Sequence, residues 1–254
     1  MKRILKFFLN KIPRPILISI SFFIKPLLPY FLKGNKFTDP IDGKSFSKFL
    51  PYGYVKQREN ALSPSTFSLE RHRLLWLYLK NKTSFFSKPA KVLHFAPEQI
   101  FYEKFRKLKH LDYTTTDLNS PIADVKADIC NLPFEDNSYD IILCNHVLEH
   151  IPNDTKAMQE LYRILKPNGM AILQIPQDLS REKTFEDNTI TNPKERTKIF
   201  GQYDHVRVYG KDYFDKLRSV GFKVEEVDYT NELRPEEVSK YALAKGEIIP
   251  VCYK

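Results

Sequence analysis

Four short apolar runs, separated by helical lengths or turns, follow one another in the second half of the chain. They are 91–97 (KVLHFAP), 113–117 (YTTTD), 139–145 (YDIILCN) and 170–176 (MAILQIP). Continuous rather than alternating runs are typical of strands buried on both faces, as in a parallel sheet that helices cover on both sides. The pattern therefore predicts an α/β fold with a doubly wound, mostly parallel sheet.

Helical periodicity fills the intervals between these runs and continues beyond them. Asp154 is positioned to cap a helix that ends at residues 166–169 (KPNG), which combine a proline with a glycine. After Tyr209 a second amphipathic segment ends at Gly221. Two further strands are predicted at 222–227 and 248–253.

The first 38 residues have a different composition from the rest. They contain eight basic and no acidic side chains, and so account for eight of the nine net positive charges. Large apolar residues lie between these charges. Basic plus apolar composition favours an anionic membrane surface, where each Lys or Arg contributes about 1 kcal/mol.

Other interpretations of this arm remain open. It could pack on its own domain, span a membrane or be a secretory signal. Lys25, Pro15, Pro26 and Pro29 interrupt its apolar stretch, which is shorter than the roughly 20 residues that a spanning helix needs. No small-residue cleavage site follows it. We expect peripheral membrane contact through residues 1–35.

Composition divides the chain into three parts: the arm 1–35, a middle segment 36–88 and an α/β domain 89–254. The three cysteines are odd in number and far apart, so they predict neither a disulfide framework nor a metal set. This favours a cytoplasmic location.

The end of the first strand lacks glycine. Where a dinucleotide fold places a glycine-rich turn, this chain has His94, Ala96, Pro97 and Glu98. Proline donates no N–H, so a pyrophosphate cradle, and with it a nicotinamide or flavin enzyme, is disfavoured. Glu98 offers a negative partner for an ammonium group. Asp117 ends the second strand near the roughly 20-residue spacing typical of ribose-binding acids, although it also suits a turn or helix cap.

The region from Asp128 to residue 170 carries a family resemblance. Asp128, Leu132-Pro133-Phe134, Ser138-Tyr139-Asp140, Asn145, the run 147–150 (VLEH) and the run 165–170 (LKPNGM) resemble consecutive signatures of the class I S-adenosylmethionine-dependent methyltransferases, in the subgroup related to ubiquinone and menaquinone methylating enzymes. The resemblance extends from about residue 91 to the C-terminus. It implies a seven-stranded, mostly parallel Rossmann-like sheet with a small N-terminal appendage.

The resemblance also implies roles for individual residues. S-adenosylmethionine is the expected cofactor, with Asp117 on the ribose hydroxyls, Asp128 and the Ile129 backbone at the adenine, and Asn145 on the methionine side. The usual acidic residue and glycines of the first motif are replaced in this chain. The complete implied cofactor-binding set is His94, Ala96, Glu98, Asp117, Leu118, Asp128, Ile129, Asn145 and His146.

Methyl transfer to oxygen needs a base, and neutral imidazole titrates near working pH. His150 and His205 are the candidates, although His150 also suits a packed position at a helix start. Tyr203 and Arg207, in the polar and aromatic run 202–210, are candidates for acceptor binding; a solvated arginine is the alternative.

Two short motifs in the middle segment have the spacing of the paired knuckles of a small zinc ribbon. They are 39–43 (DPIDG) and 63–66 (SPST), and the expected cysteines are absent. Asp, Ser and Thr are poor ligands for a tetrahedral thiolate site, so no metal is predicted and hydrogen bonds are expected to hold the turns. Ordinary turns are the alternative.

These observations favour a methyltransferase acting on oxygen of a small amphipathic acceptor, such as a glycan or lipid-linked precursor, at the membrane surface. One alternative is an RNA methyltransferase that uses the arm to bind phosphates; the apolar residues of the arm and the nearly neutral remainder of the chain count against nucleic acid. The other is a non-catalytic binding module with a degenerate methyltransferase fold.

Overall fold

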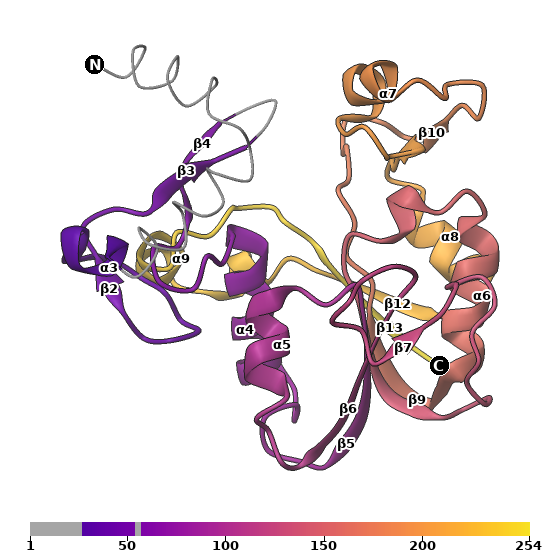
Figure 1. Ribbon diagram of the computed structural model, residues 1–254, viewed down its shortest axis with the longest axis horizontal. Helices are drawn as coiled ribbons and strands as arrows, with labels where there is room; N and C mark the ends of the chain where they lie inside the picture. Colours follow the sequence, from indigo (N-terminus) through magenta and orange to yellow (C-terminus); the bar gives the residue numbers. More distant parts are fainter. Residues whose placement is uncertain (1–26, 54–56) are drawn as a thin grey trace. The chain divides into compact units, whose positions relative to one another are not determined.

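A computed structural model describes residues 27–53 and 57–254. The chain forms two compact units. The first contains the described residues up to Leu77 together with Thr230–Lys245, and the second contains Tyr78–Tyr229 and Gly246–Lys254. The second unit carries the central sheet (Figure 1).

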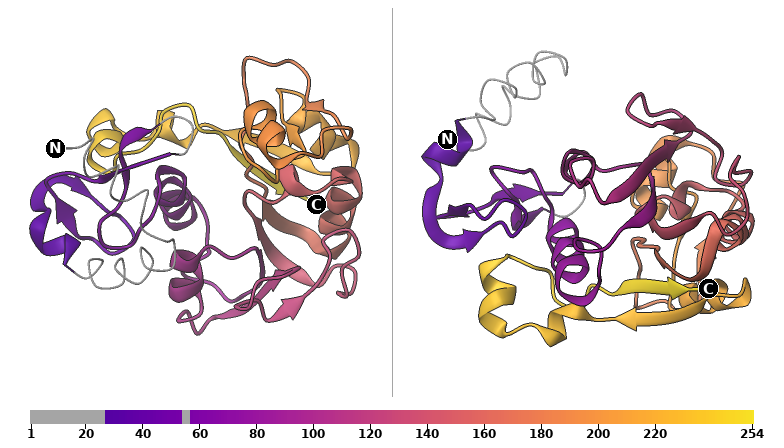
Figure 2. Two further views of the ribbon diagram at one scale, coloured as in Figure 1. Left: turned by 45° about the horizontal axis from the view of Figure 1, so that its top comes forward. Right: turned by 90° about the horizontal axis from the view of Figure 1, so that it is seen from below.

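The sheet has seven strands in the order β12-β13-β9-β8-β5-β6-β7. Neighbours from β9 (Leu165–Ile172) through β8 (Tyr139–Cys144), β5 (Ala90–Phe95) and β6 (Leu111–Asp117) to β7 (Val125–Lys126) are parallel. Strand β13 (Ile249–Tyr253) is antiparallel to both β9 and β12 (Lys223–Val227), and Figure 2 shows the β12–β13 pair. The predicted seven-stranded, mostly parallel class I methyltransferase fold is confirmed.

Both faces of the sheet are covered, as the continuous apolar runs predict. In β5, Leu93 and Phe95 belong to the core that includes residues of α6 (Asp154–Ile164) and α8 (Tyr213–Ser219). The neighbouring position His94 instead contacts the rings of Phe101 and Phe105 in α5 (Gln99–Phe105). Helix α5 thus covers one face and α6 and α8 the other (Figure 1).

Local boundaries differ from the prediction at two places. Asn153, not Asp154, caps α6, because the Asn153 side chain accepts a hydrogen bond from the Lys156 N–H. Residues 166–169, which were predicted to end the helix, lie within β9. They interrupt the regular pairing of β9 with β8, and Asn168 has φ 62° there. The helix itself ends at Ile164, as the prolines and glycines of that region require.

The first unit is built from short elements. They are α3 (Leu28–Phe31), the pair β1 (Lys33–Thr38) and β2 (Ser45–Phe46), the pair β3 (Leu50–Tyr52) and β4 (Arg58–Leu62), the first part of α4 (Glu70–Lys82), and α9 (Pro235–Lys240). A 3₁₀ turn, η2 (Tyr229–Glu232), precedes α9.

The buried side chain of Arg73 joins segments that lie on opposite sides of the predicted division at residue 89. Its guanidinium donates to the carbonyl oxygens of Tyr241 at 2.8 Å and Ala242 at 2.7 Å, and also to that of Ser68 at 2.7 Å. Fixed N–H donors inside a protein need acceptors. The segment Thr230–Lys245 supplies two of them, and it therefore belongs to the first unit rather than to the predicted domain 89–254.

Hydrogen bonds join the two turns predicted as a cysteine-free zinc ribbon. The carboxylate of Asp39, fully buried, accepts from the Ile41 N–H at 2.9 Å through Oδ1. Its Oδ2 accepts from the hydroxyls of Thr66 and Ser68, the latter at 3.0 Å. A buried carboxylate thus ties residues 39–41 to residues 66–68.

The end of the predicted arm is exposed. Leu27, Tyr30 and Phe31 have 50%, 79% and 80% of their surface accessible to solvent. Residues 1–26, which contain six of the eight basic residues found in the first 38 positions, lie outside the described residues. Within the part of the chain that the structure describes, no helix is long and apolar enough to cross a membrane.

Candidate functional site

A cavity of about 450 Å³ lies at the carboxyl ends of the parallel strands, in the second unit. This volume falls in the range of roughly 300–1,000 Å³ that small-molecule sites occupy. The lining residues follow four strands and one later loop: Phe95, Ala96, Thr116, Asp117, Leu118, Asn119, Ala127, Asp128, Ile129, His146, Val147, His150, Ile151 and Asp204. Six of the nine predicted cofactor-binding residues are among them: Ala96, Asp117, Leu118, Asp128, Ile129 and His146.

Asp117 and Asp128 face this same cavity and are held in the same way. Asp117 Oδ1 accepts from the N–H groups of Asn119 at 2.7 Å and Ser120 at 2.6 Å. Asp128 Oδ1 accepts from the Cys130 N–H at 2.8 Å. Each carboxylate therefore uses one oxygen to fix its own loop, a common Asx-turn arrangement. Among residues 27–53 and 57–254, Asp117 Oδ2 has no hydrogen-bond partner, whereas the Cys130 thiol also interacts with the Asp128 carboxylate.

Two residues of the lining have left-handed backbone conformations although neither is glycine. Ala96 follows β5 with φ 43°, and His146 follows β8 with φ 54°. A side chain with a Cβ adopts this region at a cost, and such residues cluster at functional sites. Ala96 thus makes the sharp turn for which the family uses glycine. Its N–H donates to the carbonyl oxygen of Thr116 at 2.9 Å.

The other three predicted cofactor-binding residues form a hydrogen-bonded chain beside the cavity. His94, fully buried, lies between the Tyr113 hydroxyl (2.7 Å from Nδ1) and a Glu98 carboxylate oxygen (2.8 Å from Nε2). The other Glu98 oxygen accepts from Asn145 Nδ2 at 3.4 Å. Burial raises the pKa of Tyr113 well above its usual value, so its hydroxyl stays protonated.

Asn145 leaves one buried atom unsatisfied. The side chain is only 4% exposed, and its Oδ1 accepts no hydrogen bond within the described portion of the chain. Such an acceptor is costly to bury without a donor. Together with the Glu98 carboxylate, it is an arrangement suited to a cationic ligand group.

The two predicted bases lie next to each other. The rings of His150 and His205 are 4.7 Å apart between centroids and nearly perpendicular, at 84°. His205 Nδ1 is 3.1 Å from the carbonyl oxygen of Phe200, so it carries the proton and Nε2 has the lone pair. Burial lowers the pKa of His205 below its ordinary value. A neutral imidazole with an available Nε2 is the form that accepts a proton.

Acidic side chains lie beside His150 and His146. His150 Nδ1 lies 3.4 Å from Asp204 Oδ2, and His146 Nδ1 lies 3.3 Å from Glu149 Oε1. Asp204 also lines the cavity. The sequence analysis did not select Asp204, although its position next to His205 was a usable signal.

Arg207 and Tyr203, the predicted acceptor-binding residues, are not among the residues that line the cavity. Arg207 is 2% exposed, and its guanidinium donates to the carbonyl oxygens of Leu148 at 3.0 Å and Pro152 at 2.9 Å and to Glu186 at 2.9 Å. Its donors hold the turn η1 (Leu148–His150) instead of facing the cavity. We therefore assign Arg207 a positioning role for His150. Tyr203 is 62% exposed and does not line the cavity.

Comparisons with known proteins match part of this chain to methyltransferases. Residues 90–173 match a family model described as "Methyltransferase domain". The demethylmenaquinone methyltransferase of Staphylococcus epidermidis is 42% identical over 48 residues, which are 19% of this chain and 20% of that protein. The 2-phytyl-1,4-naphtoquinone methyltransferase of Nostoc punctiforme is 27% identical over 115 residues, covering 41% of this chain and 50% of that protein.

Among solved structures, a SAM-dependent methyltransferase from Archaeoglobus fulgidus superimposes with a TM-score of 0.48 and 15% identity, covering 74% of this chain and 95% of that one. The chain thus matches half or less of the length of the two curated relatives named above.

The left-handed turn at Ala96 generates a stability prediction. We expect Ala96→Gly to raise the free energy of unfolding by about 0.5–1 kcal/mol in urea denaturation, because relief of the left-handed strain exceeds the entropy that glycine adds to the unfolded chain. Ala123→Gly is the matched control, since Ala123 is not in a left-handed conformation; it should lower stability slightly. Equal losses in the two variants would show that Ala96 is not strained.

Proposed function

We propose that the chain transfers a methyl group from S-adenosylmethionine to an oxygen atom of a small amphipathic acceptor, and the match of residues 90–173 to a methyltransferase-domain family model supports this proposal. The observation that carries it is the cavity that Asp117 and Asp128 share, where Asp117 keeps one carboxylate oxygen for a ligand. The hydroxyl and amino groups of a nucleoside are the donors that such oxygens accept.

The residues fit the cofactor at its nucleoside end. Asp117 is the last residue of β6, so its free oxygen is placed for the ribose hydroxyls, and Asp128 with the Ile129 backbone follows β7 for the adenine. Asx turns hold both loops in place, so the loops lose little conformational entropy when a ligand binds. Leu118, 62% exposed, offers an apolar surface beside them.

The residues beside the cavity fit the methionine end. Glu98 carries negative charge and Asn145 Oδ1 is an orphaned acceptor, which together suit an ammonium group. His94 holds Glu98 from the opposite side. When bound, the cofactor supplies an electrophilic methyl group, and the chain's own part is to position the acceptor and exclude water.

His150 and His205 are placed for an acceptor hydroxyl. His150 lines the cavity, and the ring of His205 packs against the ring of His150. His205 presents Nε2 as a base, because the Phe200 carbonyl fixes its tautomer. Asp204 orients His150 through Nδ1 and Arg207 holds the turn on which His150 lies. A base at this place suits an acceptor hydroxyl, whose oxygen gives up its proton as the methyl group is transferred.

The arm supports an acceptor that resides at a membrane surface. The exposed Leu27, Tyr30 and Phe31 continue the basic and apolar composition of residues 1–26. Amphipathic segments of this composition bind anionic bilayers by combining apolar insertion with charge. A lipid-linked sugar or a comparable glycan precursor is an acceptor that carries hydroxyl groups to such a surface.

The cofactor site is tested by calorimetry with S-adenosylmethionine. We expect Asp117→Asn to bind about 10-fold more weakly than the unaltered chain, because a charge-assisted hydrogen bond is replaced by a neutral one. The amide oxygen can still accept from Asn119 and Ser120, so the loop keeps its shape.

The matched control is Asp112→Asn, an exposed aspartate near the amino end of the same strand, β6. It should leave affinity unchanged. Equal affinity of Asp117→Asn and the unaltered protein, or no binding by the latter at millimolar cofactor, would refute the proposed site.

Membrane contact is tested by co-sedimentation with vesicles. Removal of residues 1–26 deletes six basic and no acidic side chains. We expect it to weaken binding to phosphatidylglycerol vesicles at least about 100-fold, since each charge contributes about 1 kcal/mol near such a surface. Phosphatidylcholine vesicles and 0.5 M salt are the controls. Undiminished sedimentation of the shortened chain would rule out anchoring by the arm.

A further inference from the structure

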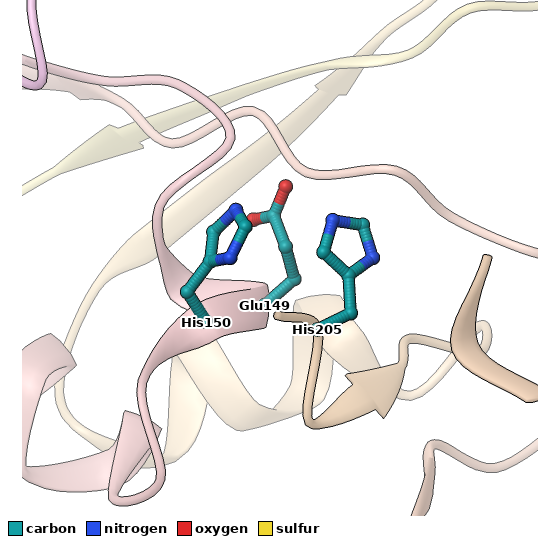
Figure 3. A group of neighbouring side chains, drawn as sticks. All are labelled: Glu149, His150 and His205. Atoms are coloured by element: carbon teal, nitrogen blue, oxygen red, sulfur yellow. The ribbon is translucent and has the colours of Figure 1, made fainter. Parts of the chain in front are cut away.

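One carboxylate and two imidazoles converge beside the cofactor cavity. Glu149 and His150 belong to η1, and His205 lies between α7 (Pro193–Phe200) and β11 (Arg207–Val208). One ligand atom of each side chain lies within 4.8 Å of the others. Figure 3 shows the Glu149 carboxylate between the two imidazole rings.

The Glu149 carboxylate is buried with one oxygen unsatisfied. Its side chain is 1% exposed, and Oε1 is 3.3 Å from His146 Nδ1. Oε2 has no hydrogen-bond partner in the described chain, and no described Lys or Arg forms an ion pair with Glu149. Burial of a carboxylate in this state is costly unless a cation or a donor compensates it. The site therefore favours a positively charged ligand at this oxygen.

Both histidines are oriented as metal ligands usually are. His205 donates from Nδ1 to the carbonyl oxygen of Phe200, and the proton that His150 places on Nδ1 is directed at Asp204 Oδ2, 3.4 Å away. Each ring then presents Nε2 as a neutral donor of a lone pair. Metal-binding histidines characteristically give their second N–H to a carbonyl or a carboxylate, which fixes the ring and its tautomer.

We propose that Glu149, His150 and His205 bind a divalent metal ion of the zinc class, with an open coordination position toward the cavity. Two imidazole nitrogens and one carboxylate are a ligand set of zinc sites that keep a position for water or substrate. Zinc bonds of about 2.0–2.2 Å bring ligand atoms to about 3.4 Å from one another in a tetrahedron, so the three side chains would close by about 1 Å on binding.

The open position indicates what the metal would do, and this step rests on the proposed function. His150 both belongs to the triad and lines the cavity, so the ion would face the bound acceptor. A divalent ion binds hydroxyl oxygen and lowers its pKa. The acceptor class that follows is a hydroxyl or phenol whose oxygen coordinates the metal, with the two histidines acting through the ion.

The test measures metal binding directly. The full chain, freed of affinity tags and stripped with a chelator, is titrated with Zn²⁺ by calorimetry and with Co²⁺ by visible absorption. We expect one equivalent of metal bound, with the intense absorption of tetrahedral cobalt. Glu149→Gln and His205→Ala should each weaken Zn²⁺ binding about 100-fold or more, whereas Asp204→Asn, which alters only the orientation of His150, should weaken it about 10-fold.

His110→Ala is the matched control, because His110 lies outside the triad and contacts the Phe85 carbonyl. It should leave affinity and stoichiometry unchanged. Circular dichroism verifies that each variant is folded, and the His205 variant keeps the test decisive if the Glu149 variant does not fold. Absence of zinc binding by the unaltered chain, or triad variants that bind zinc as tightly as His110→Ala does, would overturn the proposal.

The same samples separate this inference from the proposed function. S-adenosylmethionine binding is measured on the chelator-treated chain. Cofactor binding without stoichiometric zinc binding overturns only the metal site. Zinc binding that depends on the triad, without cofactor binding, supports the metal site and overturns the proposed function.

Discussion

Parallel alignment of β5, β6, β7 and β8 is the constraint on which the site depends. In a parallel sheet every strand delivers its last residue to the same edge, and the connections return on the faces. Asp117, Asp128 and His146 come from three separate strand connections, but each lies at the end of a strand or just after it, at that same edge. The hydrogen-bond register of the sheet, Phe95 opposite Thr116 and Cys144, brings these ends together before any site residue contributes.

The loops at this edge keep their shape through the residues that face the cavity. Asp117 and Asp128 each use one carboxylate oxygen to bind the local backbone at the edge of the cavity. Ala96 and His146 accept left-handed strain, which the packed strands on either side maintain. Behind them, Arg207 donates to backbone carbonyls and to the Glu186 carboxylate, and it fixes the turn that presents Glu149 and His150. The geometry of the site is thus preformed by the chain itself.

The sequence predicted the strands closely, because runs buried on both faces leave a clear apolar pattern. Asp117 was selected because it ends such a run, and Asp128 because of the resemblance to the methyltransferases; both line one cavity. The segment Thr230–Lys245 could not be assigned, because its place depends on carbonyl groups that the distant Arg73 needs. The burial of Arg207 could not be predicted for a similar reason: most of its partners are backbone oxygens, which have no sequence signature. The convergence of Glu149 with His205 depends on a loop more than fifty residues later in the chain, and so it too required the fold.

The central claim is that the carboxyl edge of the sheet binds a nucleoside between Asp117 and Asp128. The most direct measurement is a crystal structure of the chain with S-adenosylhomocysteine. The account predicts ribose hydroxyls within hydrogen-bond distance of Asp117, with the adenine beside Asp128 and the Ile129 backbone. Ligand bound away from this cavity, or a cavity filled by side chains in crystals grown at saturating ligand, would contradict it.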